Sequence, residues 1–178
     1  MLRRVNPSDL AAVRPEPLDP QTLVEAQRIV ESVRAGGEPR LREWSEKLDG
    51  LAPSATLLID RAGLQAALES LPAGQRGVLE RTAERITCFA EAQKSQLGAL
   101  DTPIPGGRAG HSIEPIERVG CYAPGGRFPL PSSALMTAIP ARVAGSSEIW
   151  IASPRPAQAT LAAAAIAGAD GMLCAGGA

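Results

Sequence analysis

Strand-like and helix-like segments alternate regularly through the last third of the chain, and this alternation restricts the possible folds more than any other feature. Residues 119–123 and 148–152 are short apolar runs typical of buried strands, and a third run begins at 172–175. Segments with helical character, 132–145 and 157–168, separate them. Such alternation predicts parallel strands joined by right-handed crossovers. Ligands of such sheets bind at the carboxyl ends of the strands.

The loop after the first of these strands, PGGRFPLPSS, has the strongest functional signal. Gly125 and Gly126 lack Cβ atoms, so a ligand could approach the backbone N–H groups closely. The next helix, for which Ser132 or Ser133 is the expected cap, would offer its positive end to a phosphate. However, the G-x-G-x-x-G fingerprint is absent, and no acidic residue directly follows the second strand. On spacing alone, a plain Gly-Pro turn and a non-standard nucleotide loop both stay open.

The first part of the chain, residues 1–110, is predicted to be mainly helical. A helix capped by Asp19 should begin at Pro20 and end at Gly36-Gly37, with Leu23 and Val30 on one apolar face. The further expected elements are a helix over 38–48 with Leu48 inward, a short strand at 55–59, a helix from Asp60 to Pro72 and a long helix over 74–97. The Gly- and Pro-rich stretch 98–110 is predicted to be a linker.

Composition excludes several kinds of function. The formal net charge of −1 leaves no basic surface for nucleic acid, and no apolar run approaches the length of a membrane span. The first residues lack the apolar core of a signal peptide, so we expect a cytoplasmic protein. Three scattered cysteines, Cys88, Cys121 and Cys174, suggest neither a disulfide framework nor a zinc site.

The run RVGCYAPGGRFPLPSSALMTAIPARVAG, residues 118–145, closely resembles a pattern of the histidinol dehydrogenase family. That pattern is V-G-x-Y-x-P-G-G followed by P-S-S-x-L-M-x-x-x-P-A-x-V-A-G. Two further stretches, VRAGGEPRLREWSEKLDG and IAGADGMLCAGGA, are also similar to segments of the family. The chain therefore resembles the N-terminal portion of a histidinol dehydrogenase, with small departures such as Ala123 where valine is usual.

The resemblance implies a homodimeric, zinc-dependent enzyme of histidine biosynthesis that oxidises L-histidinol to L-histidine through histidinal in two NAD-linked steps. It also implies an α/β fold in which a helical N-terminal segment precedes an incomplete Rossmann-like βαβαβ unit with parallel strands, here a partial NAD-binding unit over 111–178. Among the family's cofactor contacts, the tyrosine of the Y-x-P-G-G motif matches Tyr122, which would lie against NAD. We add Gly125 and Gly126 as cofactor-binding neighbours on physical grounds.

The family's Glu-His acid/base pair and its Gln, His, Asp and His zinc ligands lie downstream of the G-G-A stretch. We therefore assign no catalytic or metal-binding residue, and we expect the chain alone to be inactive. The single histidine, His111, falls in the expected linker, where a solvated side chain is the common outcome. Two alternatives stay open, namely a related zinc-dependent dehydrogenase of another small alcohol and a truncated, non-catalytic module.

We also expect the third strand to present an open sheet edge.

Overall fold

The computed structural model describes Asn6 and residues 19–125 and 128–176. Its helices are α2 (Pro20–Trp44), continued by a π-helical turn η1 (Ser45–Asp49), then α3 (Arg61–Glu69), α4 (Ala73–Lys94), α5 (Pro131–Ala144) and α6 (Gln158–Ile166). Its strands are β1 (Leu58–Asp60), β2 (Leu100–Ile104), β3 (Gly107–His111), β4 (Arg118–Tyr122), β5 (Glu148–Ala152) and β6 (Gly171–Leu173). Within these residues, no helix combines the length and apolar character needed to cross a membrane.

Four strands form the central sheet, in the order β1-β6-β5-β4. β4 pairs with β5 and β5 pairs with β6, both in parallel, which confirms the predicted strand–helix alternation. The short strand expected at 55–59 is shifted to Leu58–Asp60 and pairs antiparallel with β6. The expectation of an open edge at β6 is therefore wrong, because β1 occupies that edge.

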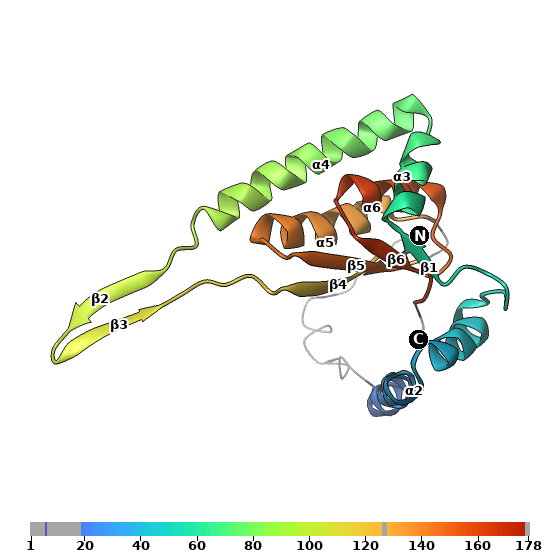
Figure 1. Ribbon diagram of the computed structural model, residues 1–178, viewed down its shortest axis with the longest axis horizontal. Coiled ribbons are helices and arrows are strands. Elements are labelled where there is room, and N and C mark those ends of the chain that lie inside the picture. Colours follow the sequence, from blue (N-terminus) through green and yellow to red (C-terminus); the bar gives the residue numbers. More distant parts are fainter. Residues whose placement is uncertain (1–5, 7–18, 126–127, 177–178) are drawn as a thin grey trace.

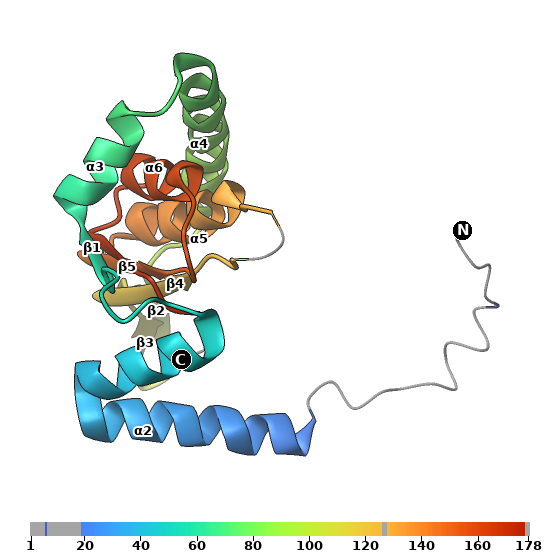
Figure 2. The same ribbon diagram turned by 90° about the vertical axis from the view of Figure 1, so that its right-hand side faces the viewer.

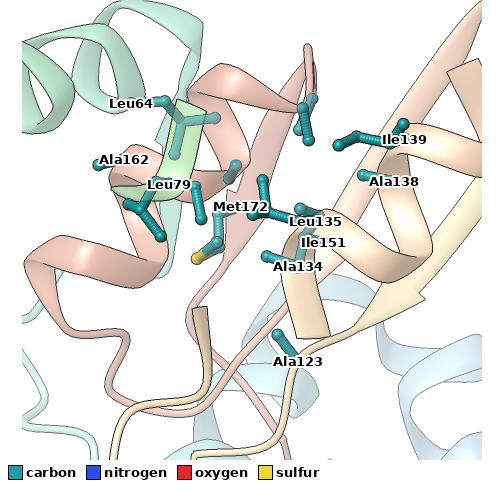
Figure 3. Close-up of a cluster of buried hydrophobic side chains, with 14 of the residues drawn as sticks. Leu64, Leu79, Ala123, Ala134, Leu135, Ala138, Ile139, Ile151, Ala162 and Met172 are labelled. Atoms are coloured by element: carbon teal, nitrogen blue, oxygen red, sulfur yellow. The ribbon is translucent and has the colours of Figure 1, made fainter. Parts of the chain in front are cut away.

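One face of the sheet carries the main hydrophobic core. Helices α3, α4, α5 and α6 lie over this face (Figures 1 and 2). Ile151 and Met172 from the strands pack against Leu135 of α5 and Leu64 of α3 (Figure 3). The Ala-rich helix α6 contacts both α3 and α5, and its small side chains allow these helices to approach closely. We estimate that loss of one such leucine side chain would cost about 2–5 kcal/mol.

The N-terminal helix α2 lies on the other side of the sheet (Figure 2). The predicted break is present as a kink at Gly37, whose φ is 61°. None of the residues of α2 is buried, and Leu23 and Val30 are 50% and 53% exposed, so the predicted apolar face of this helix does not pack into the core. The inward position expected for Leu48 is also wrong, since this side chain is 46% exposed.

The stretch 98–110, predicted as a linker, contains most of a β-hairpin. β2 and β3 pair antiparallel around a tight turn in which Gly106 has φ 88°. Gly110 is needed for this pairing, because a Cβ there would lie 2.1 Å from the carbonyl oxygen of Leu100. All ten strand positions of the hairpin are exposed, and the hairpin extends away from the end of α4 (Figure 1). The division of the chain near residue 110 stays a prediction.

The start of α5 differs from the expected cap. Pro131 occupies the first position of the helix, and the N-cap residue before it, Leu130, makes no side-chain capping hydrogen bond. Proline suits this position because its fixed φ is helical and its missing N–H would have no partner inside the helix. The prediction that Ser132 or Ser133 caps the helix is therefore wrong, since both lie within its first turn.

Candidate functional site

The parallel strands bring three loops together at one edge of the sheet. The loop after β4 begins at Ala123, whose N–H donates to the carbonyl of Ala152, 2.9 Å away. The loop after β5 begins at Ser153, whose N–H donates to the carbonyl of Leu173, also at 2.9 Å. These two bonds continue the sheet for one residue beyond β4 and β5. The three loops therefore start from a common, fixed base, which is the position where ligands of parallel sheets bind.

Tyr122 is the last residue of β4, and its side chain is half-exposed. Its neighbour in the strand, Cys121, is buried in the main core beneath the helices. Because side chains alternate along a strand, Tyr122 points to the opposite face of the sheet, which it shares with Trp150 of β5. The ring is thus exposed at the carboxyl edge, as the sequence motif led us to expect, while its contact with a cofactor stays a prediction.

Gly125 and Gly176 hold the three loops close together. A Cβ on Gly125 would lie 2.3 Å from the carbonyl oxygen of Pro154, and a Cβ on Gly176 would lie 2.5 Å from the ring of the same proline. Pro154, which follows β5, therefore sits between the loops after β4 and β6. Loop packing is therefore a reason for glycine at position 125 that the sequence alone did not indicate. Its predicted role in cofactor binding stays a prediction, and Gly126 lies outside the described residues.

A cleft of about 250 Å³ opens beside these loops. Its lining includes Pro124, Gly125, Pro154, Arg155 and Thr160, the last from the first turn of α6. Arg155 is exposed and has a φ of 46°, a left-handed conformation that non-glycine residues rarely adopt and that is common at functional sites. Nothing in the sequence pointed to Arg155, because a residue that precedes a proline is expected to have an extended backbone.

The size and charge of this cleft suit part of a dinucleotide. A volume of about 250 Å³ is below the roughly 300–1,000 Å³ of sites that enclose a whole small molecule. The cleft combines the Arg155 cation with the amino end of α6, where the N-cap residue Ala157 has no side-chain acceptor. Both features favour an anionic group such as a pyrophosphate. The rest of a dinucleotide would then extend outside the cleft, along the carboxyl ends of the parallel strands.

Asp49 is a second residue near the site that the sequence analysis missed. The sequence places it only directly after the helix predicted over 38–48, yet its side chain accepts a hydrogen bond from the N–H of Gly176 at 2.8 Å. The two residues are 127 positions apart, so no local pattern could have paired them.

The buried cysteines are not nucleophiles poised for catalysis. Burial raises the pKa of the Cys174 thiol, and burial likewise raises the pKa of Cys121 despite an opposing hydrogen bond with Thr137. Both thiols are therefore protonated at neutral pH. The scattered positions predicted three buried, reduced thiols, and this is wrong for the third cysteine, Cys88, which is exposed.

A zinc ion, which the family resemblance implies, finds no suitable ligand set in the described part of the chain. Within those residues, no group of three or more His, Cys, Asp or Glu side chains could hold a metal. The only histidine of the sequence, His111, lies at the exposed end of β3 on the projecting hairpin. The described residues therefore do not fit a zinc site.

A larger hollow of about 690 Å³ lies among α3, α4, α5 and α6. Two arginines line it, but both are engaged by Asp170: Arg61 forms an ion pair with its carboxylate, and Arg142 donates to Oδ2 at 3.1 Å. Burial alone would raise the pKa of Asp170, yet hydrogen bonds from the Ile149 N–H and from these arginines lower it. This cluster joins elements of the fold, so we do not assign a ligand to it.

Known proteins resemble this chain both in sequence and in fold. A histidinol dehydrogenase from Pseudomonas syringae pv. syringae and one from Dechloromonas aromatica are 41% and 42% identical to the chain, each over 156 residues. These alignments cover 84% of this chain and 35% and 36% of the relatives, so the chain spans about a third of the length of the curated relatives it matches. A crystal structure of histidinol dehydrogenase from Elizabethkingia anophelis shares the fold, with a TM-score of 0.78 at 22% identity, over 97% of this chain and 41% of that one.

The family assignment rests on sequence. A family model described as histidinol dehydrogenase matches residues 14–178, which include the strands, the three loops and the Tyr122 motif. The resemblance seen in the sequence is thereby confirmed over most of the chain. The chain belongs to the histidinol dehydrogenase family.

Proposed function

We propose that this chain forms the NAD-binding part of an enzyme that oxidises L-histidinol to L-histidine through histidinal, in histidine biosynthesis. Family membership supports the reaction, and the observation that carries the cofactor assignment is the position of Tyr122. Its half-exposed ring stands at the carboxyl end of β4, two residues before Pro124 of the cleft. Bound NAD would supply the hydride acceptor of the reaction.

Each residue of the edge has a distinct part in this proposal. The ring of Tyr122 packs against the dinucleotide and its hydroxyl offers a hydrogen bond. The guanidinium of Arg155, a residue that lines the cleft, attracts the pyrophosphate. Gly125 and Pro154 keep the loops after β4 and β5 in direct contact. Gly126, which has no Cβ, would allow the dinucleotide to come close to the backbone N–H groups, as its place in the sequence motif suggested.

The resemblance extends the proposal to the whole enzyme. We propose a zinc-dependent homodimer in the cytoplasm, with L-histidinol and NAD as its small-molecule ligands and with neither nucleic acid nor a membrane as partner. The described residues do not fit the zinc, so the proposal places its ligands elsewhere in the enzyme.

A calorimetric titration of the purified chain with NAD⁺ tests the cofactor assignment. ATP is a stringent control because it carries more negative phosphate charge than NAD⁺ and the same adenosine group, but no nicotinamide. We expect saturable binding of one NAD⁺ per chain and weaker binding of ATP. Absence of saturable NAD⁺ binding by folded protein, or equal affinity for ATP, would contradict the proposal.

A further inference from the structure

A buried carboxylate ties the N-terminal helices to the loop after β6. Asp49, the last residue of η1, is 9% exposed, and its Oδ2 accepts a hydrogen bond from the N–H of Gly176 at 2.8 Å. Hydrogen bonds to an ionised acceptor are stronger than those between neutral groups. This bond therefore fixes the position of a loop that no strand pairing holds at that residue.

The turn that presents Asp49 is itself well fixed. Gly50 has φ 65°, and its N–H and that of Leu51 both donate to the carbonyl of Ser45, which closes the wide π-helical turn. Leu51 then packs with Leu57 and Cys174 in a small apolar cluster. The N–H of Cys174 also donates to the carbonyl of Leu57 at 2.7 Å. Asp49 thus acts from a rigid base that already touches the end of β6.

The position of Gly176 affects the other two loops. Gly176 packs on the ring of Pro154, and Pro154 packs in turn on Gly125, with no room for a Cβ at either glycine. A displacement of Gly176 would therefore free Pro154 to move, and this would alter the cleft that Pro154, Gly125 and Arg155 line. Asp49 is thus linked to the cleft through a series of direct contacts.

From these contacts we infer that Asp49 is a positioning residue for cofactor binding: its carboxylate holds the Gly176 loop, and through Pro154 it keeps the cleft beside Gly125 in its binding shape. The identity of the ligand, NAD, rests on the proposed function. The hydrogen bond between Asp49 and Gly176 is observed in the structure. It assigns to the helical N-terminal segment a part in ligand binding that the sequence had not indicated.

Ser45 supplies a matched control. It lies in the same π-helical turn and is fully buried, and its Oγ is the only fully buried side-chain oxygen or nitrogen in the described ranges without a hydrogen-bond partner. Ser45→Ala therefore changes a buried polar side chain of this turn without removing a described link to Gly176. Loss of a buried hydroxyl that has no partner is close to neutral for stability.

The test compares the wild-type chain with Asp49→Ala, Asp49→Asn and Ser45→Ala in two measurements. Hydrogen exchange of the Gly176 amide, followed by NMR, reports the hydrogen bond directly, and calorimetry reports NAD⁺ affinity. We expect Asp49→Ala to weaken NAD⁺ binding by about tenfold and to speed Gly176 exchange by a similar factor. Asp49→Asn, which retains an acceptor oxygen, should restore most of the affinity, and Ser45→Ala should resemble the wild type.

The outcomes separate this inference from the proposed function. If wild-type protein does not bind NAD⁺, the proposed function fails, and Asp49 then has no role in NAD⁺ binding. Exchange of the Gly176 amide still shows whether the Asp49 carboxylate holds the Gly176 loop. If Asp49→Ala binds NAD⁺ as tightly as Ser45→Ala, or if Asp49→Asn restores nothing, the positioning role is overturned. Should Asp49→Ala not fold, Asp49→Leu, which keeps a side chain of similar size but has no acceptor oxygen, decides in the same two measurements. Faster exchange at Gly176 with unchanged exchange in β6 supports the role, and unchanged Gly176 exchange overturns it.

Discussion

At the scale of single residues, Tyr122 carries the cofactor hypothesis because its aromatic ring is exposed at the carboxyl edge of the sheet. A tyrosine held in the core would have a buried ring, yet half of this side chain is accessible. An exposed aromatic group on a rigid strand loses little conformational entropy when a ligand covers it.

Replacement of Tyr122 by alanine should weaken NAD⁺ binding while the chain stays folded. We expect a loss of about 1–3 kcal/mol, or roughly ten- to hundredfold in affinity, from ring packing and one hydrogen bond together. Tyr122→Phe should recover the packing part only. Calorimetric titration of the three proteins measures this, and unchanged affinity in folded Tyr122→Ala would rule the ring out as a contact.

Gly125 should tolerate a methyl group poorly for a different reason. In Gly125→Ala the added Cβ would meet the Pro154 carbonyl and ring, so the two loops must separate, at a cost of about 1–3 kcal/mol. Gly120→Ala in β4 is the control, because nothing lies within 4 Å of its Cβ position, and it should change stability by less than about 0.5 kcal/mol. Chemical denaturation compares them, and equal stability would show that the loops do not pack as described.

At the scale of elements, Asp170 joins four parts of the fold. Its Oδ2 accepts from the N–H of Ile149 in β5 at 2.8 Å and from Arg142 of α5, its other oxygen binds Arg61 of α3, and it immediately precedes β6. Arg142 also donates to the carbonyl of Gly168 after α6. The cluster therefore fixes the helical layer to the sheet.

The lowered pKa of Asp170 makes stability depend on pH in a defined direction. The carboxylate is favoured in the folded state, so its contribution is present above the unfolded pKa and is lost as the pH falls through the folded pKa, below about pH 4. Asp170→Asn should lower the free energy of unfolding by about 2 kcal/mol at pH 7 and should reduce the acid-dependent loss.

Asp101→Asn is the matched control, because the Asp101–Arg108 ion pair lies exposed on the hairpin and should contribute less than about 1 kcal/mol. Denaturant unfolding curves recorded from pH 7 to pH 3 give the free energies of unfolding for both comparisons. If Asp170→Asn and wild type lose stability in parallel across this range, Asp170 is not the group responsible.

The elements that the sequence predicted best are those with local signals. Asp19 before Pro20, the apolar runs of β4 and β5 and the periodicity of α4 are visible within a short window, and the structure confirms all of them. The hairpin β2–β3 was missed because its strands carry Gly and Pro and no buried alternation. The pairing of β1 with β6 and the Asp49–Gly176 bond join distant residues, which periodicity cannot reveal.

At the scale of the whole molecule, the two faces of the sheet differ. Four helices cover one face, whereas the other carries Tyr122 and the half-buried Trp150, with α2 on that side (Figure 2). The Trp150 ring lies over Gly171, where a Cβ would come within 2.3 Å of it. Of these two aromatic side chains, Tyr122 is the one that is exposed, and it lies at the end of β4 where the candidate site begins.

The chain alone should not oxidise L-histidinol. Its single histidine is on the hairpin, and a catalytic zinc usually needs about three protein ligands, which no cluster of the described residues provides. We therefore expect no NADH formation from histidinol and NAD⁺, measured by absorbance, with or without added zinc. Turnover well above a protein-free control, in material free of host enzyme, would contradict this expectation.

The most direct measurement is an NMR titration of the isotopically labelled chain with NAD⁺, because it locates the ligand on the structure. We predict saturable shifts of the amides of Tyr122, Gly125, Arg155 and Gly176, at the ends of the three parallel strands, while the amides of β2 and β3 stay unchanged. If folded protein shows no saturable shifts, or if the largest shifts fall on the helix-lined hollow around Arg142, these loops are not the NAD site.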